Sequence, residues 1–397
     1  MKLLYSLTNY PPSVGGAQIH HHLLAQSMCK RQHSVQAFTH WNSNRTDWLL
    51  GTTLKAPFVS HEYCIDSISV HCTSFSISEK LRLIPSVCFY YPFKKGSLSC
   101  IAGLIEQKLN PFSVKADLVH NVRIGRAGIT QASLLSARRC KIPFILTPVH
   151  HPRWKGWRYR AYNQLYRQAD AVIALTQAEK NILIDLGVDP ARIHVTGVGP
   201  VLSEASNPPC FRKRLGLADE PSILFLGQHY TYKGFSQLLS AAPLVWEKFP
   251  ESNIVFVRPP VRDSEREFLR NTEPRIHRLG QVSLQEKTDA LSACTLLCVP
   301  SLQESFGGVY TEAWSFKKPV IGGNIPAIAE QITKGMYGYL TSQQPNDIAA
   351  QITKLLQDPL KAAQMGRAGY QKVAARFTWE KLALATESIY KSVLSSS

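Results

Sequence analysis

Short apolar runs alternate with helix-like stretches along almost the whole of this 397-residue chain. In the first half, these runs predict strands at 3–7, 34–39, 118–120, 144–147, 171–175 and 193–196. In the second half, they predict strands at 222–227, 253–257, 276–279, 296–299 and 319–322. Strands that alternate with helices, such as the helix expected at 18–29, usually pair in parallel beneath those helices. The alternation therefore predicts an α/β protein built on parallel sheets.

Length and composition divide this pattern into two domains. A chain of 397 residues is too long for one ordinary hydrophobic core. The segment 199–209 has the Pro- and Ser-rich composition of a linker. We therefore expect a parallel α/β domain at 1–200, a second parallel α/β domain at 201–376 and a closing segment at 377–397. Apolar residues at helical spacing predict that this last segment is a helix.

Positive charge is concentrated in the first half of the chain, which has a formal net charge of +17. Residues 1–200 contain 23 Lys and Arg against 10 Asp and Glu, whereas residues 201–397 contain 22 against 18. Such an excess attracts anionic lipids, phosphorylated acceptors or nucleic acid. A generally basic, soluble surface accounts for the same excess without a specific partner.

Other features of the sequence narrow the location and the chemistry. No apolar segment approaches the roughly 20 residues that span a bilayer. The nine cysteines form no Cys-x-x-Cys pair, so we expect reduced thiols in a cytoplasmic protein. A P-loop and an Asp-x-Asp pair are both missing. The histidines at 20–22 are adjacent and so point in different directions, whereas a zinc pair on a helix needs i, i+4 spacing. We expect them mostly on a helix surface, and we expect no metal site.

The run from Glu304 to Glu312 carries the most specific signal. Two carboxylates stand eight positions apart, with Phe-Gly-Gly between them. A buried strand end is expected before the run, at 295–300, and a helix after it, at 311–316. Glycines at a loop-to-helix junction allow close approach to an anion, and the helix N-terminus adds partial positive charge. This pattern favours a nucleotide-sugar site, although Gly-Gly is often only a turn and two glutamates are often only solvated.

Together these motifs resemble the retaining nucleotide-sugar glycosyltransferases of group 1, also called family 4. The Glu304-to-Glu312 spacing matches the family's Glu-x7-Glu motif. The other matching elements are Gly15-Gly16, Leu226-Gly227, Lys233-Gly234, Pro300-Ser301, Pro319-Val320-Ile321, Phe377-Thr378-Trp379 and Tyr390. The resemblance covers nearly the whole chain and is loosest between about 45 and 117. It implies the GT-B architecture, in which two Rossmann-like domains face a central cleft.

The resemblance also implies roles for individual residues. Glu312 is expected to bind ribose hydroxyls, and Glu304 is expected to contact the transferred sugar. Lys233 adds a point charge for the diphosphate. The remaining members of the expected nucleotide-sugar site are Gly15, Gly16, Val282, Ser305, Phe306, Gly307, Gly308 and Val309. The backbone N–H groups of 306–308 would cap the diphosphate, and the glycines at 15 and 16 would let the N-terminal loop close.

One position departs from the family pattern. Members of the family usually carry an Arg directly after the glycine that corresponds to Gly227, and this chain has Gln228 there. An amide can donate to phosphate without supplying charge. Arg258, which stands where a glycine-rich turn is usual, is a candidate for the missing charge.

A histidine after a strand of the N-terminal domain is typical of the family, and it faces the donor. The run that ends in His150 and His151 offers two candidates after the strand at 144–147. We favour His151 because it precedes Pro152. Either histidine could instead be an ordinary loop residue.

The implied reaction moves a sugar from a nucleoside-diphosphate sugar to an acceptor hydroxyl with retention of anomeric configuration. The donor is a co-substrate, and no cofactor or metal is expected. The acceptor could be a sugar, a lipid-linked molecule or another compound. Cations interleaved with aromatics near 153–167, and again at 88–95, suit peripheral contact with an anionic membrane, but they also suit helix packing.

Three other functions compete with this one. A sugar-nucleotide epimerase or a phosphorylase would share the fold. A silent nucleotide-sugar-binding scaffold would keep the same site without turnover. A basic nucleic-acid-binding protein is disfavoured, because the sequence carries no helix-turn-helix, zinc-finger or RNP signature.

Overall fold

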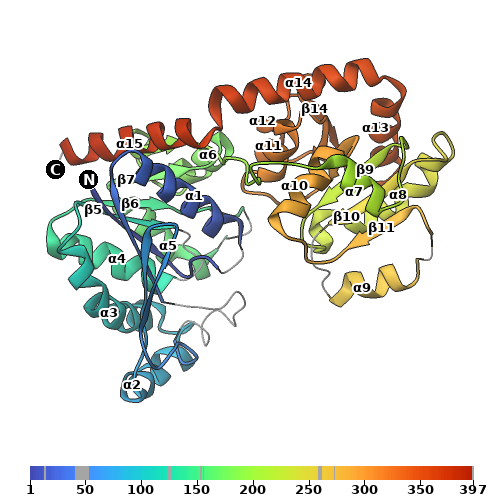
Figure 1. The fold of residues 1–397 in the computed structure, drawn as a ribbon. Helices are drawn as coiled ribbons and strands as arrows, with labels where there is room; N and C mark the ends of the chain where they lie inside the picture. The colour runs from blue at the N-terminus through green and yellow to red at the C-terminus, as the bar shows by residue number, and fades with distance from the viewer. Residues whose placement is uncertain are drawn as a thin grey trace. The chain divides into compact units, whose positions relative to one another are not determined.

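Two sheets of mainly parallel strands organise the chain, one in each of two units (Figure 1). The computed structural model describes residues 1–12, 15–40, 53–122, 127–152, 154, 156–257, 262–271 and 273–395. The first unit comprises Met1–Gly197 together with Trp379–Ser397, and the second comprises Val198–Thr378. The chain thus leaves the first unit at residue 198 and returns to it at residue 379. Within the described residues, no helix is long and apolar enough to cross a membrane.

The first unit contains an eight-stranded sheet in the order β3-β4-β2-β1-β5-β6-β7-β8. Its strands are β1 Lys2–Leu7, β2 Ser34–Thr39, β3 His61–Ile65, β4 Ile68–Cys72, β5 Leu118–Val122, β6 Phe144–Thr147, β7 Ala171–Ala174 and β8 Ile193–Val195. Its helices are α1 Gly16–Lys30, α2 Ile77–Cys88, α3 Lys94–Ser113, α4 Ala127–Cys140, α5 Arg160–Gln168, α6 Gln177–Asp185 and α15 Trp379–Ser395, with short 3-10 turns at Trp157–Tyr159 and Pro190–Arg192. All neighbouring strands pair in parallel except β3 and β4, so the predicted α/β class is confirmed.

Alternate residues of β1 enter two separate cores, because side chains along a strand point to opposite faces of the sheet. Leu3 and Tyr5 pack with residues of α1 and α15 on one face. Leu4 packs with residues of α3 and α4 on the other face. Both faces are therefore covered by helices, which explains why the strands read as nearly continuous apolar runs.

The β3–β4 hairpin was not predicted from the sequence. Its two turn residues, Asp66 and Ser67, both have positive φ values, of 47° and 65°. In sequence, two-residue turns of this kind are usually recognised by Asn-Gly or Asp-Gly, and here neither residue is glycine. The strands are also rich in polar residues, so hydrophobic periodicity does not mark them.

The closing helix α15 packs along α1 and anchors the end of the chain in the first unit. Tyr390 is completely buried, and its hydroxyl lies 3.0 Å from the Tyr5 hydroxyl and 2.6 Å from His120 Nδ1. Trp379, at the start of the helix, packs its ring 5.1 Å from the ring of His20. These contacts join residues 270 or more positions apart in sequence.

The histidines at 20–22 were expected mainly on a helix surface, and this expectation is wrong. All three side chains are buried, because α1 packs against both the sheet and α15. The ring of His21 packs 5.6 Å from that of His120, and His22 Nε2 lies 2.8 Å from the Asp66 carboxylate. Burial lowers the pKa of His21 to about 4 and lowers the pKa values of His20 and His120 well below the usual range.

This buried histidine cluster predicts that the protein loses stability in mild acid. The pKa values of His20, His21 and His120 are lower in the folded protein than in the unfolded chain, whose histidines titrate near 6.5. Their contribution is therefore complete above about pH 6.5 and is lost as the pH falls below it, when only the unfolded chain takes up protons. Each such histidine should cost about 1.4 kcal/mol per pH unit in that range.

Burial also raises the pKa of Glu179 to about 7, so this carboxyl stabilises the fold as the pH falls and partly hides the histidine effect. Comparing the wild type with a His21→Gln variant, in which Glu179 is unchanged, isolates the contribution of His21. Free energies of unfolding should be measured between pH 7.5 and pH 5.5 for both proteins. The wild type should lose more stability than the variant over this range. Parallel pH profiles would contradict the assignment of a neutral, buried His21.

The basic and aromatic segment near 153–167 contributes most of its described aromatic rings to the core. Tyr162 and Tyr166 are buried, and Trp154 and Tyr159 pack against the same cluster of apolar residues. Only Trp157 among them is exposed. Arg153 and Lys155 lie outside the described residues. Helix packing, rather than a membrane surface, therefore accounts for these aromatics.

The second unit contains a six-stranded, fully parallel sheet in the order β11-β10-β9-β12-β13-β14. Its strands are β9 Ser222–Leu226, β10 Asn253–Val257, β11 Ile276–Leu279, β12 Leu296–Val299, β13 Val320–Gly323 and β14 Gly338–Thr341. Its helices are α7 Pro208–Arg214, α8 Phe235–Trp246, α9 Arg262–Leu269, α10 Leu284–Ala293, α11 Gly308–Ser315, α12 Pro326–Gln331, α13 Pro345–Gln357 and α14 Pro359–Arg376, with a 3-10 turn at Thr231–Lys233.

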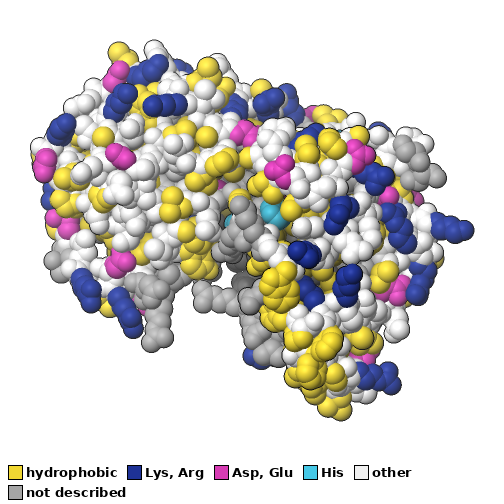
Figure 2. All heavy atoms as spheres, turned by 180° about the vertical axis from the view of Figure 1, so that it is seen from behind, with side chains coloured by type: hydrophobic (Ala, Val, Ile, Leu, Met, Phe, Trp, Pro, Cys, Tyr) yellow, Lys and Arg dark blue, Asp and Glu magenta, His cyan; other side chains and the backbone are white. Residues whose placement is uncertain are grey.

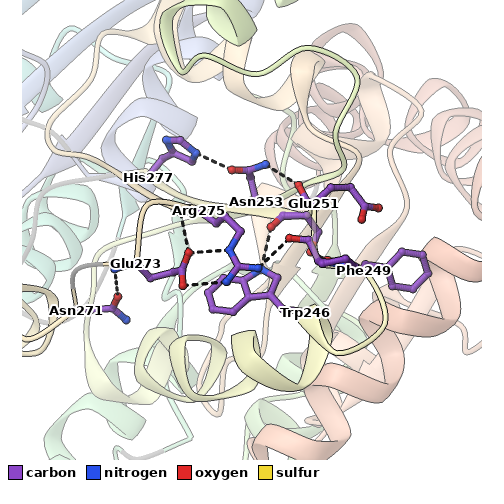
Figure 3. A network of polar contacts seen from close by, with 10 residues as sticks. Trp246, Phe249, Glu251, Asn253, Asn271, Glu273, Arg275 and His277 are labelled. Carbon is purple, nitrogen blue, oxygen red and sulfur yellow. Dashed lines mark hydrogen bonds and ion pairs between the residues drawn. The ribbon is translucent and has the colours of Figure 1, made fainter.

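A polar network closes the outer edge of this sheet (Figure 3). The Arg275 guanidinium lies 4.0 Å from the centre of the Trp246 ring and donates to both carboxylate oxygens of Glu273, at 2.7 and 2.9 Å. His277, on β11, lies 2.9 Å from the Asn253 side-chain oxygen on β10. The network ties the edge strand β11 to the end of α8.

Candidate functional site

The strand order of the second sheet reverses between β9 and β12. In open parallel sheets, ligands bind beyond the carboxyl ends of the strands at such a reversal. The loops that follow β9 and β12 both begin at this point, and they contain Lys233 and Glu304. The topology therefore brings together two segments that the sequence separates by about 70 residues.

Backbone and amide hydrogen bonds hold these two loops in contact. The Leu302 N–H donates to the Tyr232 carbonyl at 2.8 Å. The Gln343 side-chain amide donates to the same carbonyl at 3.0 Å and to the Pro300 carbonyl at 2.7 Å. Gln343 follows β14, so three loops at the carboxyl edge of the sheet share one anchor. A rigid edge of this kind positions the side chains that it carries.

Lys233 and Glu304 form an ion pair between the two loops. Both side chains are mostly buried, with 19% and 12% of their surfaces exposed. Gly234, directly after the lysine, has a φ of 81°, and a side chain there would lie 2.7 Å from the Pro300 carbonyl oxygen. The glycine thus permits the close approach that lets Lys233 reach Glu304.

Helix α11 begins at Gly308, three residues before the sequence predicted. Gly307 is its N-cap and has a left-handed backbone conformation, with a φ of 83°. Any residue with a side chain would be strained at this position. Phe306 is buried against Phe377, and the Tyr310 hydroxyl donates to the Val299 carbonyl at 2.9 Å. These anchors fix the start of the helix, whose first N–H groups have no partner within it. The junction can therefore receive an anion.

Glu312 lies one turn into α11 and is held by a buried lysine. Lys287 Nζ donates to Glu312 Oε1 at 2.8 Å, and the Val201 N–H approaches the same oxygen at 3.4 Å. Only 4% of the Lys287 side chain and 8% of the Glu312 side chain are exposed. Glu312 Oε2 is buried and accepts no hydrogen bond from the residues that the structure describes. The carboxylate is thus fixed through one oxygen and retains acceptor capacity on the other.

Sequence reasoning missed Lys287, although the sequence contains a signal for it. The residue lies on α10, which starts with a capping box formed by Ser283 and Glu286. Ala290 and Leu291, three and four positions later, are both buried, so Lys287 belongs to the inward face of the helix. A lysine on an inward face requires a partner, because lysines are almost never fully buried unpaired.

The loop after β9 is anchored by His229, next to the exposed Gln228. His229 is completely buried, and its ring lies within 6 Å of those of Phe225, Phe235 and Phe268. Burial lowers its pKa to about 4, so the imidazole is neutral at physiological pH. The histidine fixes the backbone from which the Gln228 side chain extends.

The remaining residues predicted for this site are less constrained. Ser305 and Val309 are half-buried on either side of the helix start. Val282 is half-buried just before α10. Arg258 lies outside the described residues. Within the described ranges, no group of three His, Cys, Asp or Glu side chains is placed to hold a metal ion.

The other predicted site residues lie in the first unit, each after a strand of its sheet. Gly15 is the N-cap of α1 and Gly16 is its first residue, after β1. His150 follows β6 and is buried, with its Nδ1 2.9 Å from the Tyr166 hydroxyl and its backbone N–H donated to Glu179. Burial lowers the pKa of His150 to about 4.

His151 is more accessible than its neighbour. It is half-buried, and its ring packs 5.6 Å from that of Trp154. The contacts of His150 indicate a role in holding the loop. A direct role for His151 stays a prediction.

Two family models match the chain. The model described as "Glycosyl transferases group 1" matches residues 210–372, which contain the site of the second unit. The model described as "Glycosyl transferase 4-like domain" matches residues 15–199. A curated relative, the D-inositol 3-phosphate glycosyltransferase of Xylanimonas cellulosilytica, is 26% identical over 95% of this chain and 91% of its own length.

Solved structures share the fold over the whole chain. The Anabaena protein HepE, crystallised in complex with UDP and glucose, matches with a TM-score of 0.74 at 19% identity, over 99% of this chain and 100% of that chain. Sucrose-phosphate synthase from Thermosynechococcus elongatus matches with a TM-score of 0.74 at 18% identity, over 100% of both chains. At these identities the likeness is one of architecture.

Proposed function

The chain belongs to the group 1 glycosyltransferases and has their two-domain GT-B fold, and on that premise we propose the reaction that it catalyses. A sugar is transferred from a nucleoside-diphosphate sugar to an acceptor hydroxyl, with retention of anomeric configuration. The nucleotide sugar is a co-substrate. The product is a polysaccharide, a glycolipid or another glycoconjugate, and the acceptor is a sugar or a lipid-linked molecule.

The arrangement of Glu312 is the observation that carries this proposal. One of its oxygens is fixed by Lys287, and the other is buried without a partner among the described residues. A buried carboxylate acceptor is costly unless a ligand satisfies it. A ribose diol supplies hydroxyl donors of the required kind. UDP in the complex of the similar Anabaena protein supports a nucleotide as that ligand.

The diphosphate fits the start of α11 and Lys233. Its negative charge grows as the bond to the sugar breaks, so fixed positive charge aimed at it lowers the barrier. The first N–H groups of α11 and the ammonium of Lys233 supply that charge. Glu304, paired with the lysine, is then placed to accept hydrogen bonds from hydroxyls of the transferred sugar. The departing phosphate oxygen can take the acceptor's proton. From the first unit, His151 is the residue that we propose to contact the donor.

We expect turnover to survive an excess of chelator. Lys233 and the helix start provide the positive charge that a divalent ion would otherwise bring to the diphosphate. Initial rates with and without EDTA should therefore agree, with an enzyme of known magnesium dependence as the control. Loss of activity that is restored by added Mg²⁺ or Mn²⁺ would contradict this part of the mechanism.

A panel of nucleoside diphosphates tests the proposed function. Binding to the folded state raises the melting temperature, so one nucleotide should stabilise the protein while DNA and RNA have no comparable effect. Incubation with nucleotide sugars, followed by mass spectrometry, should then reveal slow hydrolysis of the matching donor. Epimerised sugar would instead indicate the epimerase, phosphate-dependent cleavage the phosphorylase, and binding without any turnover the silent scaffold.

We place the protein in the cytoplasm, in peripheral contact with an anionic membrane. Nine free cysteines support a reducing compartment. The excess of Lys and Arg in the first half supports attraction to an anionic surface.

A further inference from the structure

Helix α2 carries two apolar stripes, although the core of the first unit uses only one of them. The inward stripe includes Leu83 and Val87, both buried. The outward stripe consists of Ile77, Leu81 and Ile84, whose exposed fractions are 68%, 60% and 41%. Their spacing of four and three positions places them on one side of the helix. A surface helix normally turns polar residues outward, so this second stripe requires an explanation.

Neighbouring segments add further exposed apolar side chains to the stripe. Phe89 and Phe93, which follow the helix, are 56% and 67% exposed and pack their rings 6.2 Å apart. Phe58 lies beside the helix, because Lys80 Nζ is only 3.4 Å from the centre of its ring. We call Phe58, Val59, Ile77, Leu81, Ile84, Phe89 and Phe93 the outer α2 surface. Figure 2 shows hydrophobic side chains gathered at this end of the first unit.

The charges around the outer α2 surface are almost all positive. Residues 53–60 and 74–100 contain five Lys or Arg, namely Lys55, Lys80, Arg82, Lys94 and Lys95. The one carboxylate in these segments is Glu79. It is paired with Lys108 at 2.9 Å and caps the N-terminus of α2. The exposed cations Arg82 and Lys95 are therefore not offset by a free acid within these segments.

An apolar helix face bordered by cations matches the chemistry of an anionic bilayer surface. Aliphatic and Phe side chains partition into the boundary between headgroups and acyl chains, while Lys and Arg meet anionic headgroups. A water-exposed patch of this composition is unusual for a protein without such a partner. The basic segment at 153–167 cannot supply the apolar part, since most of its aromatics lie in the core.

We propose that the outer α2 surface docks the protein onto membranes that contain anionic lipid. This inference deepens the membrane contact in the proposed function, and it assigns that contact to residues that take no part in donor binding. The first unit would be held at the bilayer, where a lipid-linked acceptor would be presented to it.

The test is co-sedimentation of the full chain with vesicles of phosphatidylcholine, with and without phosphatidylglycerol, at low and high salt. The wild type should bind the anionic vesicles at low salt and less at high salt. The variant Ile77→Ser/Leu81→Ser/Ile84→Ser should bind roughly tenfold or more weakly, because it removes the apolar side chains that α2 itself contributes to the surface. The variant Arg82→Gln/Lys95→Gln should bind roughly fivefold more weakly for each cation removed and should depend less on salt than the wild type.

A matched control replaces exposed leucines elsewhere. Leu269, Leu360 and Leu384 are exposed and lie on other helices, so replacing all three by Ser should leave vesicle binding unchanged. Equal melting temperatures would show that each variant is folded. Equal nucleotide binding would show that the donor site is intact, so a failure of docking is separable from a failure of the proposed function.

Three results would overturn the proposal. The wild type could remain in the supernatant with anionic vesicles at low salt. The triple α2 variant could bind as tightly as the wild type, which would assign binding to another basic face. The same variant could convert a dimer to a monomer in light scattering without changing vesicle binding, which would assign the surface to a second copy of the chain.

Discussion

Replacing Lys287 by methionine is expected to destabilise the Val198–Thr378 unit by about 3–5 kcal/mol, the usual cost of leaving one buried charge of a pair unpaired. Methionine preserves most of the packing of the lysine stem while removing the ammonium. The Glu312 carboxylate would then keep the Val201 N–H as its contact, at 3.4 Å. Urea denaturation, followed by a probe of the second unit, should show a lower midpoint with little change in slope.

Two further variants show whether the loss of stability in Lys287→Met comes from the unpaired charge of Glu312. In Lys287→Met/Glu312→Gln both charges are gone, so the double variant should recover much of the stability lost by the single one. Lys213→Met, on the exposed face of α7, should change stability by less than about 0.5 kcal/mol. If the double variant were no more stable than Lys287→Met, the lysine would act through packing and not through the charge of Glu312.

Replacing Lys233 by methionine is expected to reduce kcat/KM for the donor about 100- to 1000-fold, as removal of a fixed charge donor at a developing anion usually does. The lysine is partly exposed and belongs to a loop that Tyr232 and Gln343 hold independently, so the fold should survive. Steady-state rates and calorimetric affinities for the nucleoside diphosphate should fall together. The exposed Lys248→Met variant is the matched control.

Glu304→Gln separates the two members of the pair. The change removes the carboxylate that competes with phosphate for Lys233. The affinity for the nucleoside diphosphate should therefore stay equal or rise, whereas turnover should fall because a contact with the transferred sugar is lost. Equal losses of nucleotide affinity in Lys233→Met and Glu304→Gln would contradict the separate roles.

Much of the fold could be predicted because parallel strands are buried on both faces. Each strand that reads as an apolar run, such as Asn253–Val257, was found from sequence. The β3–β4 hairpin escaped because its strands are polar and its turn uses Asp66 and Ser67 in place of glycine. Hydrophobic periodicity detects burial, and a half-exposed edge hairpin offers little of it.

The site shows a similar division. The Glu304-to-Glu312 spacing identified the loop, because glycines at a helix start leave a mark in the sequence. Lys287 was missed because its partner lies 25 positions away and only tertiary structure brings them together. The histidines at 20–22 were misjudged for the same reason. Trp379, some 360 residues later, packs against His20, and His21 and His22 meet His120 and Asp66 from distant strands and turns.

The path of the chain also has a consequence for its synthesis. The second unit is one continuous stretch, Val198–Thr378, inserted between the first and last parts of the other unit. Residues 1–197 leave the ribosome before α15 is made. The contacts of Tyr5 and His120 with Tyr390 therefore cannot form while the inserted unit is being synthesised. Domains generally fold as units in the order in which they become complete. The unit whose synthesis begins second should thus finish folding first, and α15, which is made after it, then completes the core of the other unit.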